Sequence, residues 1–125
     1  MANTHQYEPP PQSAHTPLTI AAFYTLFALA QGEQHGYAIM QATKSLSAGA
    51  FSMGPATLYP TIARLRQAGL ITETSSEKTA RELQRGRRFY KITAHGRAAF
   101  DEELARMARV IERATNGNPV PLNLA

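Results

Sequence analysis

The segment of residues 18–31 most constrains the fold, because its apolar side chains occupy most of the circumference of a predicted helix. Pro17 suits the opening turn of this helix, and Thr16 can cap it. A helix that is apolar on most sides must be buried on more than one side, and a single small domain rarely supplies two such surfaces. A second chain can supply the other, so the sequence predicts a homodimer in which this helix takes part.

A second helix is predicted at residues 36–46. Its expected inward stripe consists of Tyr37, Ile39, Met40 and Leu46. Gly49 lies just beyond its end.

A third helix is predicted at residues 55–68, with Gly69 as its C-terminal stop. Leu58, Ile62 and Leu65 follow the i, i+4, i+7 spacing of a core-facing stripe. Thr57 is the expected N-cap, with Pro60 in the first turn. The side chains off the stripe are Tyr59, Arg64 and Arg66.

Two β-prone segments follow, at residues 70–72 and 87–93, joined by a long polar and charged stretch. They predict a β-hairpin, with one of Phe89 and Tyr90 in the core because the two alternate across the strand. A last helix is predicted at residues 94–115, capped by Thr93. Its apolar positions at 4-3-4 spacing form a coiled-coil-like seam, made of Phe100, Leu104, Met107 and Ile111.

The two ends of the chain have the composition of loose tails. Residues 1–16 are polar and contain three consecutive prolines, and residues 117–125 begin with a helix-stopping glycine and contain two prolines. The predicted organisation is therefore a tail at 1–16, a folded unit at 17–93, a C-terminal helix at 94–116 and a tail at 117–125.

The positive charge of the chain is concentrated in one region. The formal net charge is +4, and residues 1–43 contain no Lys or Arg. Seven of the 13 positive charges lie between Lys78 and Arg97, where Glu82 is the one opposing acid. A hairpin tip with so many like charges repels itself unless an anion binds, which indicates a polyanionic partner.

The order helix, helix, helix, strand, basic loop, strand, helix is that of a winged helix-turn-helix. The fold class expected is therefore mainly α with a small β-hairpin and a C-terminal dimerisation helix. Such a domain places its third helix in the DNA major groove and its loop, or wing, beside the backbone or in the minor groove. A winged helix can also serve as a protein-interaction module that binds no DNA.

Four stretches of the chain resemble the PadR-type transcriptional regulators. They are HGYAI at 35–39, ATLYPTIARL at 56–65, AGLI at 68–71 and GRRFYKITAHGR at 86–97. The resemblance extends from about residue 18 to 111, and the single C-terminal helix is similar to the short subfamily. The chain departs from the family in two places: Pro55 and Ala56 stand where a glycine is usual, and no tryptophan is present on which an aromatic drug could stack.

The resemblance implies a cytosolic, dimeric repressor that binds a palindromic operator in double-stranded DNA, with the first and last helices building the homodimer. The residues expected to contact DNA come from the third helix and the wing. They are Thr57, Tyr59, Arg64, Arg81, Arg85, Arg87 and Arg88. Two alternatives stay open: Arg64 can belong to a solvated helix face, and the wing arginines to a solvated loop.

A ligand-responsive repressor also needs an effector site. The apolar side chains of the first and last helices can line a cavity for a small apolar or aromatic effector in the dimer core. The candidates are Phe23, Phe27, Phe100, Leu104, Met107 and Ile111. The alternative is that the same residues pack solidly.

The sequence offers little for other functions. It has no cysteine and no motif for a catalytic nucleophile, a phosphate loop or paired acids, so we expect no enzyme and no cofactor. None of the four histidines stands at ligand spacing from another, so we expect no metal site. No apolar run reaches the about 20 residues of a membrane span, and the lack of cysteine and of a signal peptide fits the cytoplasm.

Overall fold

The computed structural model describes residues 17–74 and 86–121, which form four helices and a small antiparallel sheet. The elements in chain order are α2 (Ile20–Ala30), β1 (Gln34–His35), α3 (Gly36–Leu46), α4 (Pro55–Gln67), β2 (Ile71–Glu73), β3 (Phe89–Ile92) and α6 (Ala94–Thr115). This is the predicted mainly helical winged-helix arrangement. Arg81 and Arg85, and both ends at 1–16 and 122–125, lie outside the described residues.

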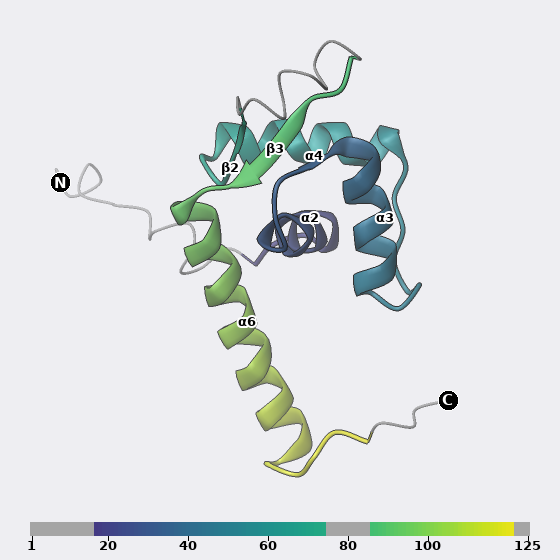
Figure 1. Ribbon diagram of the computed structural model, residues 1–125. Helices are drawn as coiled ribbons and strands as arrows, with labels where there is room; N and C mark the ends of the chain where they lie inside the picture. Colours follow the sequence, from purple (N-terminus) through teal and green to yellow (C-terminus); the bar gives the residue numbers. More distant parts are fainter. Residues whose placement is uncertain (1–16, 75–85, 122–125) are drawn as a thin grey trace, which may run out of the picture.

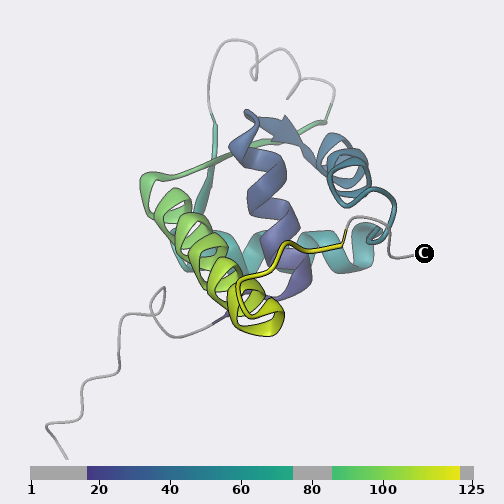
Figure 2. The same cartoon turned by 90° about the horizontal axis from the view of Figure 1, so that it is seen from below.

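Helix α2 lies in the middle of the molecule and packs against α3, α4, α6 and β3 (Figure 2). Leu26, Ala28 and Leu29 of this helix are almost fully buried. The apolar circumference read from the sequence therefore already has partners on several sides within one chain. The part of the helix that stays open is its first turn, where Ile20 is 63% exposed.

Two helix starts differ in detail from the sequence expectation. Helix α2 begins at Ile20 with Thr19 as its N-cap, so Pro17 precedes the helix instead of opening it. Helix α4 begins at Pro55 with Gly54 at the cap position, so Thr57 lies inside the first turn and Pro60 in the helix interior. The expectation that Thr57 caps α4 was wrong because Pro55 suits the first helical position, where its missing N–H costs nothing.

The sheet has three strands in the order β1-β3-β2, where the sequence predicted two. The short strand β1 pairs with β3 through Gln34 and His35, opposite Tyr90 and Phe89. Because β3 is thus central, both of its aromatic residues are buried instead of one. Tyr90 joins the main core, and Phe89 packs edge-on against the His35 ring with ring centroids 5.3 Å apart.

Helix α6 starts on the body and then leaves it. Thr93 caps it as expected, because its hydroxyl accepts a hydrogen bond from the Gly96 N–H at 2.9 Å. The buried residues of the helix all lie in its first half, the last being Glu103. The second half projects away from the other helices (Figure 1).

Candidate nucleic-acid interface

The exposed face of α4 and the base of the wing form one surface around a small hollow. The hollow has a volume of about 200 Å³ and joins three parts of the fold: the start of α3, the middle of α4 and the segment that leads into β3. Its lining residues are His35, Gly36, Tyr37, Tyr59, Gly86, Arg87, Arg88 and Tyr90. We call this feature the tyrosine–arginine hollow.

Tyr59 reaches into this hollow from α4 and is 48% exposed. Its hydroxyl lies so close to Gly36 that a methyl group at position 36 would overlap it. Tyr37, expected to point into the core, is instead 64% exposed and lines the same hollow. The buried residues of α3 are Gly36, Ile39 and Thr43, and Tyr37, in the first turn of the helix, is not among them.

The base of the wing carries two of the predicted arginines. The Arg87 guanidinium lies 3.4 Å from Nε2 of His35, the residue whose Nδ1 also caps α3. The Arg88 guanidinium contacts the Glu73 carboxylate at 3.2 Å. Arg87 and Arg88 therefore flank the hollow at fixed places relative to the start of α3 and the end of β2.

Arg66 belongs to the same surface, although it was not among the predicted site residues. It stands seven residues after Tyr59 in α4, so the two side chains lie on one face of the helix, with Ala63 between them. Its Nη1 forms an ion pair with Glu73 Oε1 at 3.2 Å. The sequence alone could have identified Arg66, because Tyr59, Ala63 and Arg66 follow the i, i+4, i+7 spacing of one helix face.

Arg64 lies on a different side of α4. It lines a second hollow of about 270 Å³ between the chain before α2, the end of α4 and the first half of α6, together with His95 and Glu103. Thr57 is exposed in the first turn of α4, on the outer side of the helix. The structure thus brings together Tyr59, Arg87 and Arg88, and it separates Arg64 from them.

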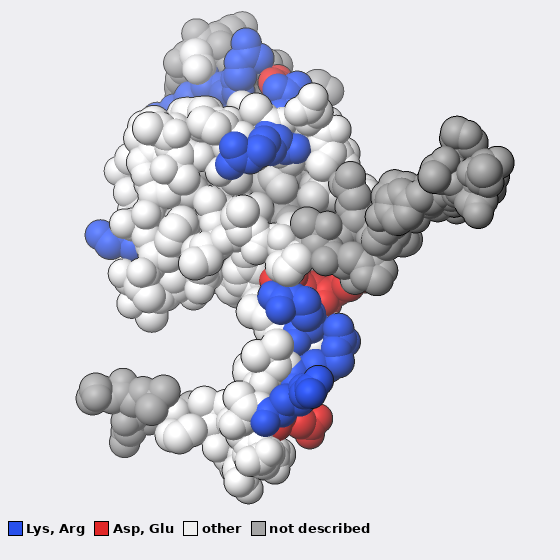
Figure 3. All heavy atoms as spheres, turned by 180° about the vertical axis from the view of Figure 1, so that it is seen from behind, with Lys and Arg blue, Asp and Glu red and all other residues white. Residues whose placement is uncertain are grey.

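The electrostatics of this surface are mainly positive. Figure 3 shows Lys and Arg side chains gathered at the wing end of the molecule and along α6, where acids accompany them. Burial and the negative charge of Glu73 raise the pKa of Tyr90 above its ordinary value. The surface offers guanidinium and hydroxyl donors, which are the groups that bind phosphate oxygens.

The candidate effector residues fall into two groups. The rings of Phe23, Phe27 and Phe100 pack directly on one another, with centroids 5.3 to 6.0 Å apart. Leu104 and Ile111 are exposed, and Met107 is half-buried. The chain itself therefore buries the predicted seam of α6 fully at Phe100, partly at Met107, and leaves it exposed at Leu104 and Ile111.

Within residues 17–74 and 86–121, no three His, Asp or Glu side chains lie close enough to hold a metal ion. None of the described helices is both long and apolar enough to cross a membrane.

The chain belongs to the PadR-like family of transcriptional regulators, whose model matches residues 25–102. It is 34% identical over 88 residues to the transcriptional regulator Rv3488 of Mycobacterium tuberculosis, an alignment that covers 70% of this chain and 76% of that protein. It is 27% identical over 85 residues to the transcriptional regulator YqjI of Escherichia coli, covering 68% of this chain. The aligned part spans 38% of the length of YqjI.

Solved structures have the same fold. A PadR-like transcription factor from Bacteroides fragilis superposes with a TM-score of 0.59 at 21% identity, over 76% of this chain and 86% of that one. BpsR of Bordetella bronchiseptica, in a study of how 6-hydroxynicotinic acid regulates its DNA binding, superposes with a TM-score of 0.58 at 26% identity, over 96% of this chain and 77% of that one. The family consists of transcriptional regulators, not enzymes.

Proposed function

We propose that this protein binds double-stranded DNA as a homodimer and represses transcription from a pseudo-palindromic operator. The observation that carries the proposal is the single surface that α4 and the wing base build, with Tyr59, Arg66, Arg87 and Arg88 on it. Helix α4, called the reading helix below, enters the major groove through this face. The wing follows the neighbouring phosphates or minor groove.

The exposed face of α4 suits close approach to base pairs. Ala56 and Ala63 flank Tyr59 at i−3 and i+4, and both are exposed. Such small residues let the helix backbone come near the groove floor, while the longer Tyr59 and Arg66 reach bases or phosphates. Thr57, in the first turn, adds a hydroxyl at the leading end of the helix. Arg64 points to the second hollow and contributes less.

Regulation by a small apolar or aromatic effector is part of the proposal. The packed rings of Phe23, Phe27 and Phe100 lie between α2 and α6, where a second copy of the chain would meet them. A ligand that prefers one arrangement of the two reading helices would shift the population between states that bind DNA and states that do not. That 6-hydroxynicotinic acid regulates DNA binding by BpsR supports such a role. Since its target is chromosomal DNA, we place the protein in the cytoplasm.

The experiment uses salt to separate DNA binding from protein interaction. Wild-type protein and the Arg87→Ala, Arg88→Ala double variant are titrated into a duplex that the wild type has selected from a random library, across a salt series. We expect the log–log slope to fall by about 0.9 for each lost phosphate contact. The matched control is Arg109→Ala plus Arg113→Ala, on the distal half of α6.

Each outcome decides a separate point. Retained slope and affinity in the wing variant would remove the wing from the mechanism. A wild type that selects no duplex at any salt concentration would favour the rival function, a winged helix that binds another protein.

A further inference from the structure

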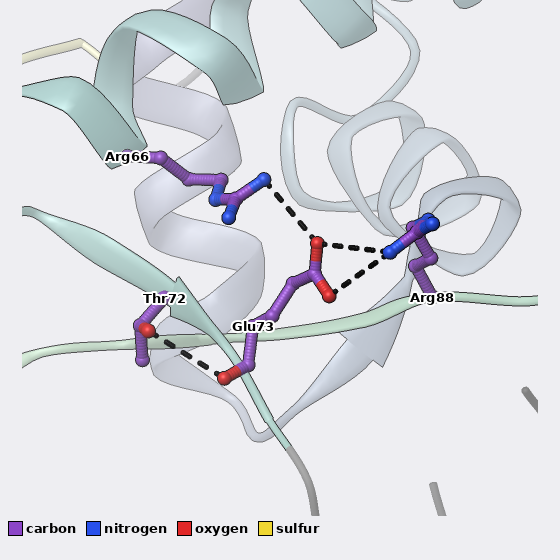
Figure 4. A network of polar contacts seen from close by, with 4 residues as sticks. All are labelled: Arg66, Thr72, Glu73 and Arg88. Atoms are coloured by element: carbon purple, nitrogen blue, oxygen red, sulfur yellow. Dashed lines mark hydrogen bonds and ion pairs between the residues drawn. The ribbon is translucent and has the colours of Figure 1, made fainter. Parts of the chain in front are cut away.

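Glu73 stands at the junction of three elements and holds two arginines at once. It is the last residue of β2, and its carboxylate lies between Arg66 of α4 and Arg88, which immediately precedes β3 (Figure 4). Oε1 contacts the Arg66 guanidinium at 3.2 Å, and Oε2 contacts that of Arg88 at 3.2 Å. The same Arg88 nitrogen also lies 3.4 Å from Oε1. One acid thus connects the reading helix to the wing.

This acid is alone of its kind on the surface. Among the described residues of α4, β2, β3 and the segment that leads into β3, Glu73 is the one carboxylate, whereas five residues are Lys or Arg. Three of them, Arg66, Arg87 and Arg88, lie on the surface around the tyrosine–arginine hollow, whereas Arg64 and Lys91 face other parts of the molecule. A negative charge in the centre of a surface that binds a polyanion opposes that binding, so its presence needs an explanation.

Stability does not explain it. The Arg66 and Arg88 side chains are 49% and 65% exposed, and ion pairs of such exposed groups add little to the free energy of unfolding. The register already fixes the backbone of β2, because Glu73 is paired with Tyr90 and the Thr74 N–H donates to the Phe89 carbonyl. The wing base would therefore keep its fold without the carboxylate.

We propose that Glu73 is a specificity-determining residue. Its carboxylate competes with DNA phosphates for the guanidiniums of Arg66 and Arg88. The two arginines leave Glu73 for phosphates only when the reading helix and the wing are both bound in their grooves. The inference rests on the proposed DNA-binding function. On non-specific DNA, where binding is almost entirely electrostatic, the two guanidiniums stay with Glu73 and contribute little. Non-specific affinity is thereby reduced.

On a matching DNA site the competition between Glu73 and the phosphates for the two guanidiniums has a different outcome. Base contacts by α4 add binding energy that non-specific DNA does not provide, and they bring phosphates to Arg66 and Arg88 in the orientation that Glu73 has already fixed. The carboxylate therefore lowers affinity for the wrong sequences more than for the right one. Specificity is such a difference of affinities, and it often includes a repulsive element.

The test replaces Glu73 by glutamine, which keeps the size of the side chain and removes its charge. Two probes are used: a random-sequence duplex of about 30 bp, long enough for two half-sites one turn apart, and a duplex of the same length that the wild type has selected. We expect Glu73→Gln to bind the random duplex on the order of threefold to tenfold more tightly, with a log–log salt slope steeper by up to about 1.8, because two guanidiniums become available. The selected duplex should gain much less, so the ratio of the two affinities falls.

Two controls isolate the cause. Glu112→Gln makes the same change in net charge on the distal half of α6, and it should leave the affinity ratio unchanged. In a background where Arg66 and Arg88 are both glutamine, Glu73→Gln should no longer steepen the salt slope, because the groups it would free are absent.

The outcomes are distinguishable. Equal gains on both duplexes would mean that Glu73 changes only net charge, and the inference would be overturned. Equal losses of affinity for both duplexes, with a lowered melting temperature of the protein, would show that the role of Glu73 is merely structural. That result would also overturn the inference. A wild type that binds neither duplex refutes the proposed function itself, and this inference with it.

Discussion

Glu103 is the most deeply buried charged side chain among the described residues, and its partner explains why it stays ionised. Its carboxylate receives two hydrogen bonds from Arg106, at 2.6 and 3.2 Å. The hydrogen bonds from Arg106, helped by one from the Leu18 backbone, lower the pKa of Glu103 below its ordinary 4.5 despite the opposing effect of burial. The pair itself lies within α6, and the contact with the Leu18 backbone connects it to the segment that precedes α2.

The sign of this shift gives a prediction. A carboxylate with a lowered pKa in the folded state stabilises the fold above its ordinary pKa, and this contribution is lost as pH falls through the lowered value. Glu103→Gln should therefore reduce the free energy of unfolding by about 1–2 kcal/mol at neutral pH. Urea unfolding followed by circular dichroism at neutral pH and at about pH 3 measures it.

The difference between the two proteins should shrink at the acidic pH. Glu112→Gln, at an exposed position on the same helix, is the control and should change little at either pH. A loss that stays the same at both pH values would assign the effect to packing instead of charge.

At the scale of elements, the start of α6 is fixed to the end of α4 by backbone contacts. The Thr93 N–H donates to the Leu70 carbonyl at 3.0 Å, and the Thr93 hydroxyl donates to the Gly69 carbonyl at 2.7 Å. Gly96 lies so close to the Leu70 carbonyl oxygen that a methyl group there would overlap it. The start of α6 is therefore closely packed against the residues that follow the C-terminal end of α4.

Gly96→Ala should accordingly destabilise the protein, although alanine favours a helix over glycine by about 1 kcal/mol. The overlap is with backbone, which cannot turn aside as a side chain can, so we expect a net loss of about 1–3 kcal/mol. Thermal unfolding measures it against Gly54→Ala, where the added methyl meets no heavy atom within 4 Å. A Gly96→Ala protein as stable as the wild type would contradict this tight junction.

The sequence predicted the helices and the hairpin because their signals are local. Apolar spacing located α2, α3, α4 and α6, and Thr93 and Gly69 marked a start and a stop that the structure confirms. Strand β1 was not predicted, because two residues are too few to show the alternation of apolar and polar side chains that marks a strand. Its existence depends on pairing with β3, more than 50 residues further along the chain. The burial of both Phe89 and Tyr90 follows from the same long-range pairing.

Part of the candidate interface was also readable from the sequence. Tyr59, Arg87 and Arg88 come together as a shared surface, because the third helix and the hairpin base are neighbours in a winged helix. Tyr37 and Glu73 were missed, since their roles depend on contacts between elements. Arg66 was passed over in favour of Arg64, although helical spacing from Tyr59 distinguishes the two.

At the scale of the whole molecule, α6 is longer than the body that it packs on. Its 22 residues span about 33 Å at ~1.5 Å per residue, and only the first half is covered. Beyond Glu103, Leu104 is 43%, Val110 52% and Ile111 48% exposed, and Met107 is half-buried. Leu104 and Ile111 stand seven residues apart on one side of the helix, and monomers rarely leave a contiguous apolar surface of this kind in water.

A two-fold axis through this surface would bury it and set the two reading helices about one DNA turn apart, roughly 34 Å. Leu104→Asp places a charge in that interface, so we expect the dimer to dissociate in analytical ultracentrifugation at micromolar concentration. Operator affinity should fall with it, because a single reading head loses the avidity of the pair.

Ala105→Asp is the matched control, since it adds the same charge one position further along, off the apolar seam of the helix. Because Leu104 is already half open in the single chain, its replacement should leave the helical circular dichroism spectrum intact, and unfolding is thereby separated from dissociation. A Leu104→Asp protein that remains dimeric would refute this interface. A wild type that is monomeric at micromolar concentration, and still binds a palindrome tightly, would refute the dimer as the DNA-binding form.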